Sequence, residues 1–196
     1  TSPVEPLSRL AVRHVVEDCT SAMKQAVEHA AGLGTRTMLV VTPSAGDTDD
    51  MSKIAKAAGI SASVLEAPPD KVLGPPASVE QGGLKAMARW LETNRLLPDL
   101  IYFPDDFLAR GCLTALLDRG IRIPQDVQVI SWANRNLGPI FPRPLTRLEN
   151  DPVEAGKNLA VIVADALKKP HKKVRQTFRI GPTFIAGETT ARRQIT

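Results

Sequence analysis

Short runs of β-branched and aliphatic residues alternate along the chain with longer amphipathic stretches. This alternation predicts βαβ units, in which parallel strands form one sheet and the connecting helices cover its faces. The expected strands are residues 10–16, 37–41, 62–65, 100–103 and 127–132. We therefore predict an α/β fold, an open parallel sheet with helices on both faces.

Helix signals fill the segments between these strands. Asp18 is placed to cap a helix that runs to Gly32. Ser78 and Gln81 have the spacing of a capping box, which predicts the start of a helix that reaches Asn94. The expected helices cover residues 18–32, 49–58, 78–94, 105–120 and 151–168.

Two later segments lack a helical period. Residues 134–144 contain three prolines and one glycine, so we predict a loop that follows the carboxyl end of a parallel strand. Open α/β sheets bind their ligands at that edge. Residues 173–188 are predicted as two extended runs separated by Gly181 and Pro182.

Composition excludes several classes of protein. The chain has 196 residues, of which 43% are hydrophobic and 23% are charged, which is typical of a globular domain. It has neither an apolar run near the roughly 20 residues of a membrane span nor a signal peptide at residues 1–10. We expect a cytoplasmic protein without membrane contact. The net charge of +4 is spread along the chain, and the basic run at residues 168–175 is interpreted as a solvated turn.

No motif in the chain predicts catalysis, a metal or a cofactor. The glycine spacing matches no nucleotide-binding loop, and no Gly-x-Ser-x-Gly elbow is present. The three histidines lack the spacing of helical metal ligands. Cys19 and Cys112 are interpreted as buried structural thiols. We therefore expect a protein that is not an enzyme and needs no cofactor.

Polar residues follow two of the expected strands. Asp105 and Asp106 come after residues 100–103, so one of them is expected to cap the next helix and the other could face a ligand. Trp132 either covers the sheet or stacks on a ligand ring, and both interpretations stay open. Residues 134–136, Asn-Arg-Asn, supply hydrogen-bond donors or form only a turn.

Residues 98–111 and 119–132, followed by Pro-Leu-Thr-Arg at 144–147, resemble the C-terminal effector-binding lobe of LacI/GalR-type bacterial transcriptional regulators. In that family a strand, an Asn-Asp pair and a helix precede the pattern Gly-Leu-x-Val-Pro-x-Asp-Val-x-Val-Val-Gly-Phe-Asp-Asp. The resemblance extends over about residues 10–190. It implies a periplasmic-binding-protein-like lobe that senses a small molecule and does no chemistry on it.

The resemblance also implies how the chain is divided. Residues 1–17 would be a strand entering from the hinge, residues 18–150 the C-terminal lobe, and residues 151–196 the last helix and returning strands of the two-lobed fold. Because no helix-turn-helix precedes residue 10, we expect part of a longer regulator, with a natural truncation as the alternative. Operator DNA would be bound only through a head domain absent from this chain. A solute-binding protein of a transport system is the alternative function.

The family pattern implies effector contacts at five positions, and the chain departs from the pattern of sugar-binding members at three places. The implied effector-binding residues are Asp47, Asp105, Trp132, Asn134 and Asn150. Sugar-binding members commonly have Arg, Asn and Asp where this chain has Asp47, Asp105 and Ala133. We therefore expect a small-molecule effector that is not standard for the family, and the aspartates favour a cationic one. Loss of effector control is the alternative.

The resemblance further implies a homodimer. The family's subunit contact lies on the helix after the Asn-Asp pair and on the loop before Pro-Leu-Thr. The implied interface residues are Phe107, Arg110, Gly111, Thr114, Ile140 and Phe141. Two phenylalanines left on a helix and a loop surface are the kind of residue that an interface buries.

Overall fold

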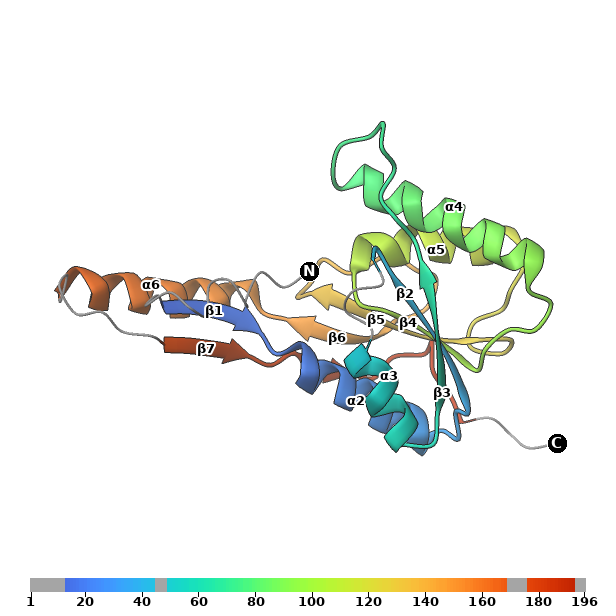
Figure 1. Ribbon diagram of the computed structural model, residues 1–196, viewed down its shortest axis with the longest axis horizontal. Coiled ribbons are helices and arrows are strands. Elements are labelled where there is room, and N and C mark those ends of the chain that lie inside the picture. Colours follow the sequence, from blue (N-terminus) through green and yellow to red (C-terminus); the bar gives the residue numbers. More distant parts are fainter. Residues whose placement is uncertain (1–12, 45–48, 169–175, 193–196) are drawn as a thin grey trace.

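The computed structural model of the chain describes residues 13–44, 49–168 and 176–192. Its main body contains a six-stranded sheet in the order β3-β2-β4-β5-β6-β8 (Figure 1). The strands are β2 (Thr37–Thr42), β3 (Ser61–Glu66), β4 (Leu100–Phe103), β5 (Gln128–Asn134), β6 (Thr146–Asn150) and β8 (Thr183–Ile185). All neighbouring pairs are parallel except β6 and β8. The predicted α/β sheet is confirmed, with one antiparallel strand added at its edge.

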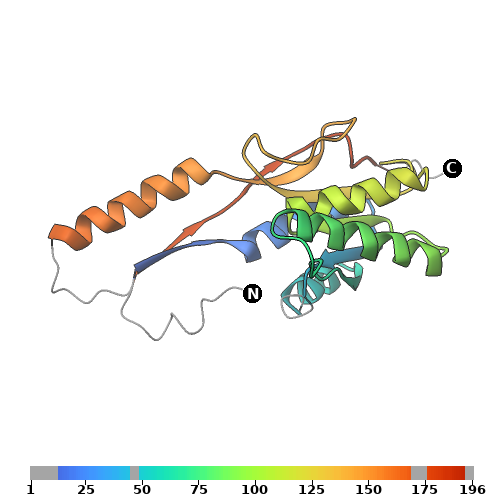
Figure 2. The same ribbon diagram turned by 90° about the horizontal axis from the view of Figure 1, so that it is seen from above.

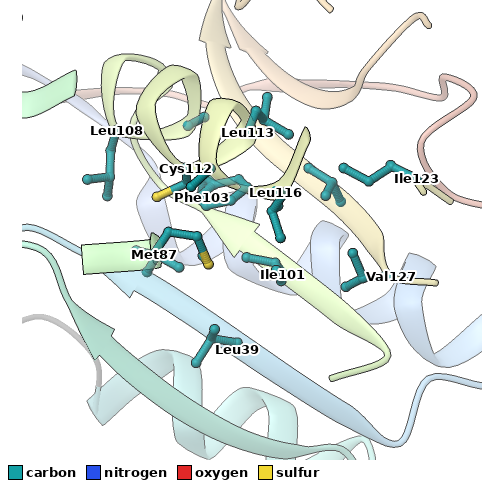
Figure 3. Close-up of a cluster of buried hydrophobic side chains, with 14 of the residues drawn as sticks. Leu39, Met87, Ile101, Phe103, Leu108, Cys112, Leu113, Leu116, Ile123 and Val127 are labelled. Atoms are coloured by element: carbon teal, nitrogen blue, oxygen red, sulfur yellow. The ribbon is translucent and has the colours of Figure 1, made fainter. Parts of the chain in front are cut away.

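Helices cover both faces of this sheet, as predicted. They are α2 (Cys19–Gly32), α3 (Asp49–Ala57), α4 (Ala77–Thr93) and α5 (Asp106–Asp118). Because side chains alternate along a strand, Met38 and Val40 of β2 pack with α2 and α3, whereas Leu39 packs with α4 and α5. Figure 3 shows the second cluster, where Phe103 lies beside Cys112 of α5. The strands β2, β4 and β5 are mostly apolar because both faces of the sheet are covered there.

A smaller part of the chain projects from one end of the main body (Figures 1 and 2). There, β1 (Arg13–Glu17) pairs in parallel with β7 (Gln176–Ile180), and α6 (Pro152–Lys168) contacts β1. The α6 helix exposes several apolar side chains to solvent. They are Val153, Leu159, Val161, Val163 and Leu167. The expected strand at residues 10–16 is confirmed from residue 13, while residues 10–12 lie outside the described ranges.

The predicted helix starts are correct in one case and wrong in another. The Asp18 side chain accepts a hydrogen bond from Ser21 N at 3.0 Å and caps α2 as expected. The capping box of Ser78 and Gln81 is wrong, because α4 begins at Ala77 and Pro76 takes the capping position without a side-chain bond. Ser78 is buried inside the first turn, where its carbonyl accepts from Asp70 N.

The strand β6 was not expected from the sequence. Its residues Thr-Arg-Leu-Glu-Asn show no apolar run, yet four of the five are buried. Glu149 is only 9% exposed, and its carboxylate forms an ion pair with Arg147 at 2.8 Å. An ion pair takes the place of apolar residues in β6, so this strand lacks the hydrophobic run by which a central strand is recognised.

The segment after β8 closes the sheet on the side of β5 and β6. Thr189 is fully buried, and its hydroxyl donates to Val129 O at 2.8 Å and accepts from Thr146 N at 2.9 Å. The neighbouring Thr190 hydroxyl lies 2.8 Å from the Thr146 hydroxyl and 2.9 Å from His29 Nε2. This tail therefore joins β5, β6 and α2. The two extended runs predicted at residues 173–188 are confirmed by β7 and β8 within the described residues.

The two cysteines have different surroundings. Cys112 of α5 is buried against Gly83 of α4, and burial raises the pKa of its thiol. Cys19 is exposed at the first position of α2, so the expectation that both thiols are buried is wrong for Cys19. Among the helices of the described ranges, none combines the length and the apolar character needed to cross a membrane.

Candidate functional site

The carboxyl ends of β4, β5 and β6 bring several predicted site residues to one edge of the sheet (Figure 1). Asp105 follows β4 by two residues. Asn134 and Asn150 end their strands as directly paired residues of β5 and β6. This shared edge follows from the parallel register, because every strand of the group ends on the same side. Asp47, another of the five predicted effector contacts, lies outside the described residues.

Asp105 uses one carboxylate oxygen to cap α5. Its Oδ1 accepts a hydrogen bond from Leu108 N at 2.7 Å. Asp106 is 9% exposed, and its pKa is raised by burial and by the neighbouring Asp105 charge. One aspartate of the pair therefore caps the helix as predicted, whereas effector contact by Asp105 stays a prediction.

Trp132 packs into the core. It is 9% exposed and belongs to the cluster formed with Ala22 and Ala26 of α2. The structure therefore agrees with the interpretation in which the indole covers the sheet. Stacking on an effector ring stays a prediction.

Asn150 lies buried where the main body meets the projecting part. Its Nδ2 donates a hydrogen bond to Glu17 Oε1 at 2.6 Å. Its Oδ1 is also buried, but no donor of the described residues reaches it. Within the described residues, this amide oxygen therefore keeps its capacity to accept a hydrogen bond.

A cavity of about 400 Å³ adjoins Asn150. It lies between the end of β1, the ends of β5 and β6, and the first turns of α6. Its lining residues are Val15, Val16, Glu17, Asn134, Asn150, Asp151, Pro152, Ala155, Gly156, Leu159 and Ile180. Asn134 and Asn150 are thus the two predicted effector contacts that share a cavity. We call this the crossing cavity, because beside it the chain passes between the main body and the projecting part.

Glu17 was missed by the sequence analysis. Glu17 lines the crossing cavity, and loss of solvation raises the pKa of its carboxyl group more than the Asn150 hydrogen bond lowers it. Its place directly before the cap Asp18, at the end of a strand, was the available signal. A single acidic residue at a strand end is too common to be assigned a role from sequence.

Arg135, a predicted hydrogen-bond donor to a ligand, forms ion pairs with two carboxylates. Its Nη1 lies 2.6 Å from Asp151 Oδ2, and its Nε lies 3.5 Å from Glu149 Oε1. Asp151 also caps α6 by accepting from Val153 N at 2.9 Å. The guanidinium of Arg135 is therefore occupied by two ion pairs, which join the ends of β5 and β6.

A second predicted surface lies on α5 and the loop before β6. The Arg110 guanidinium donates to Leu137 O at 3.1 Å, lies 3.5 Å from Glu80 Oε1 and sits 5.0 Å from the centre of the Phe107 ring. Ile140 is fully exposed. We call this the α5–loop surface; it comprises Phe107, Arg110, Thr114, Leu137, Ile140 and Phe141.

Gly111 does not belong to that surface. It is buried against Glu80 and Leu84 of α4 within the chain. The expectation that Gly111 lies at a subunit contact is therefore wrong, because α4 already covers it.

Comparison with protein families identifies the class to which this fold belongs. Residues 27–190 match the model of the periplasmic binding protein-like domain. The chain belongs to this family, which confirms the resemblance drawn from residues 98–147.

Curated relatives that are similar in sequence include transcriptional repressors. The chain is 32% identical to the HTH-type transcriptional repressor PurR of Vibrio atlanticus over 93 residues, which are 47% of this chain and 27% of that protein. It is 26% identical to PurR of Haemophilus influenzae over 103 residues, which are 53% of this chain and 30% of that protein. The matched region thus spans less than a third of the length of these relatives.

Solved structures of LacI family regulators share the fold over nearly the whole chain. One from Enterococcus faecium with bound ribose has a TM-score of 0.74 and 21% identity, covering 94% of this chain and 67% of that one. One from Arthrobacter sp. FB24 in complex with lactose has a TM-score of 0.74 and 20% identity, covering 90% and 65%. Both structures are described as LacI family transcriptional regulators.

Proposed function

We propose that the chain is the effector-binding and dimerisation region of a LacI-type transcription regulator that responds to a small molecule. The family match, the regulator relatives and the parallel sheet with its ligand edge support this proposal. In such a regulator, effector binding shifts the equilibrium between two arrangements of the lobes and thereby biases a distant DNA-binding head. A regulator of this kind works in the cytoplasm, where its operator lies.

The single observation that carries the effector site is the unpaired oxygen of Asn150. Asn150 adjoins a cavity of about 400 Å³, and no donor of the described residues reaches its buried Oδ1, so this acceptor can serve a ligand. Asn134 stands on the same wall and provides a second amide. We therefore place the effector at the crossing cavity and the adjoining edge, where Asp105 also lies.

The projecting part is proposed to belong to a second lobe. β1 precedes the main sheet in the chain, while α6 and β7 follow β6, and the exposed apolar side chains of α6 are of the kind that a packed lobe buries. The boundaries at residues 17 and 150 expected from the resemblance stay part of this proposal. DNA contact would be made by a helix-turn-helix head, as the names of the curated relatives suggest.

Calorimetric titration of the chain with ribose, lactose, adenine and spermidine tests the effector site. We expect one of these compounds to bind, and Asn150→Ala to weaken that binding about tenfold, since one hydrogen bond to a buried group is lost. Asn134→Ala should weaken it as well. The matched control is Asn94→Ala, because Asn94 is exposed at the end of α4, remote in sequence from the lining residues.

The proposed site fails under either of two results. One is that no compound of the four binds the folded chain. The other is that binding occurs and is equal in wild type, Asn134→Ala and Asn150→Ala. Thermal unfolding of each variant shows whether an altered affinity comes from the site or from loss of structure.

A further inference from the structure

The crossing cavity has a distinctive division between apolar walls and hydrogen-bond acceptors. Val15, Val16, Leu159 and Ile180 supply aliphatic walls from β1, α6 and β7. The polar lining residues gather where β1, β5 and β6 end. They are Glu17, Asn134, Asn150 and Asp151. A ligand that fills this space needs an apolar body with one polar end.

The acceptors at that polar end are not balanced by donors. Asn150 Oδ1 has no donor among the described residues, although the side chain is only 5% exposed. The Glu17 carboxylate accepts from Asn150, and none of the described basic side chains forms an ion pair with it. The guanidinium of Arg135, which follows the lining residue Asn134, is bound to Asp151 and Glu149.

We infer that the effector carries a protonated amine on an apolar body, with the ammonium group bound between Glu17 and Asn150 Oδ1. This inference rests on the proposed function and names the ligand class of the same site. An ammonium group offers three donors and no acceptor, which matches a carboxylate and an unpaired amide oxygen. Charge-assisted hydrogen bonds of this kind are about twice as strong as neutral ones.

Other ligand classes match this lining less well. A carboxylate or phosphate would face the charges of Glu17 and Asp151 without a free cation among the lining residues. A hydroxyl group donates one hydrogen bond and would satisfy either Glu17 or Asn150, leaving the other acceptor unpaired. The aliphatic walls also offer nothing to the several hydroxyls of a sugar.

Calorimetric titration of the 196-residue chain with three compounds of one shape tests the inference. The probes are 2-phenylethylamine, 2-phenylethanol and phenylacetate, which share a body and differ in charge at the polar end. We expect the amine to bind at least about tenfold more tightly than the alcohol, with phenylacetate weakest. Ribose and lactose are titrated in parallel.

The variant Glu17→Gln keeps the shape of the side chain and removes its charge. We expect it to weaken binding of the amine about tenfold or more and to leave the alcohol unchanged. The matched control is Glu28→Gln, since Glu28 is exposed on α2 and does not line the cavity. Circular dichroism confirms that both variants are folded.

The inference is overturned if the amine binds no better than the alcohol, fails to bind, or binds Glu17→Gln as tightly as wild type. If a sugar binds instead and loses affinity in Asn150→Ala, the ligand class is wrong while the proposed effector site stands. If no probe binds, and the wider panel of sugars, adenine and spermidine also fails, both proposals are wrong.

Discussion

At the scale of single residues, the turn between α5 and β5 shows how one ion pair stabilises a loop. The Arg122 backbone N–H donates to Asp126 Oδ2 at 2.8 Å, and the Arg122 Nε donates to the same oxygen at 2.9 Å. These hydrogen bonds lower the pKa of Asp126 to about 2. The carboxylate therefore stabilises the fold only while it is ionised.

The pH dependence of this contribution has a defined sign. Because the pKa of Asp126 is lowered on folding from 3.8 to about 2, its stabilisation is complete above pH 3.8 and is lost as the pH falls toward 2. Asp126→Asn should lower the melting temperature slightly at pH 7 and not at all near pH 2. Thermal unfolding by circular dichroism at both pH values measures this.

Asp118→Asn is the control for that experiment, because Asp118 is the last residue of α5 and has no such hydrogen bonds to Arg122. A loss of stability in Asp126→Asn that persists unchanged at pH 2 would contradict the assigned role of the charge.

Residues of the site differ in how far the sequence could predict them. Asn134 and Asn150 were implied by the resemblance, and the register of β5 and β6 brings them together. Glu17 depends on where β1 ends relative to β6, 133 positions later in the chain, so no local pattern reveals it. The unpaired state of Asn150 Oδ1 depends on every donor around it and is visible only in three dimensions.

At the scale of elements, the contact between α4 and α5 depends on glycines. Gly111 of α5 is buried against Glu80 of α4, and Gly83 of α4 is buried against Leu108 and Cys112 of α5. A methyl group at either position would collide with backbone of the facing helix. The short side chains therefore allow the two helix backbones to approach closely.

Gly111→Ala is expected to reduce the free energy of unfolding by about 1–3 kcal/mol, as overpacked positions do. The new methyl group would collide with the Glu80 carbonyl oxygen, which cannot turn aside as a side chain can. Urea unfolding measures the change. The control Gly32→Ala has nothing within 4 Å of the added methyl group and should cause no loss.

Sequence periodicity predicted the elements that bury an apolar face and failed where charge enters the core. The strands β2, β4 and β5 are apolar runs covered on both faces, which made them recognisable. β6 was not predicted because its charged residues Glu149 and Arg147, which form an ion pair inside the sheet, interrupt the apolar pattern. The start of α4 was misplaced because Ser78 is buried in the first turn instead of capping it.

At the scale of the whole molecule, the α5–loop surface is where we propose that a second copy binds. Its most prominent apolar residue, Ile140, is fully exposed, and Leu137 beside it is 61% exposed. Arg110 holds the loop against α5 through Leu137 O, so the surface is presented as one unit. Apolar residues around an arginine are typical of the centre of an interface.

Ile140→Asp and Arg110→Glu should each weaken self-association about tenfold or more, because a charge is placed in an apolar contact or the loop is released. Analytical ultracentrifugation over a range of concentrations measures the dimer constant. Ile140→Asp is the sharper variant, since that side chain is wholly exposed within the chain.

The control for the dimer is Arg119→Glu, which changes the same charge at the far end of α5. Sedimentation of Ile140→Asp that matches wild type, or a wild-type chain that stays monomeric at all concentrations, would place the interface elsewhere.

The buried Thr189 completes the hydrogen bonding of β5 and β6 from a distant position in the chain. Val129 and Thr146 precede the residue that satisfies their backbone groups by 60 and 43 positions. While the ribosome is still adding those positions, the nascent β5 and β6 have main-chain groups open to neighbouring chains, as edge strands do. These two backbone groups of β5 and β6 thus gain their hydrogen-bond partner only after Thr189 has been synthesised.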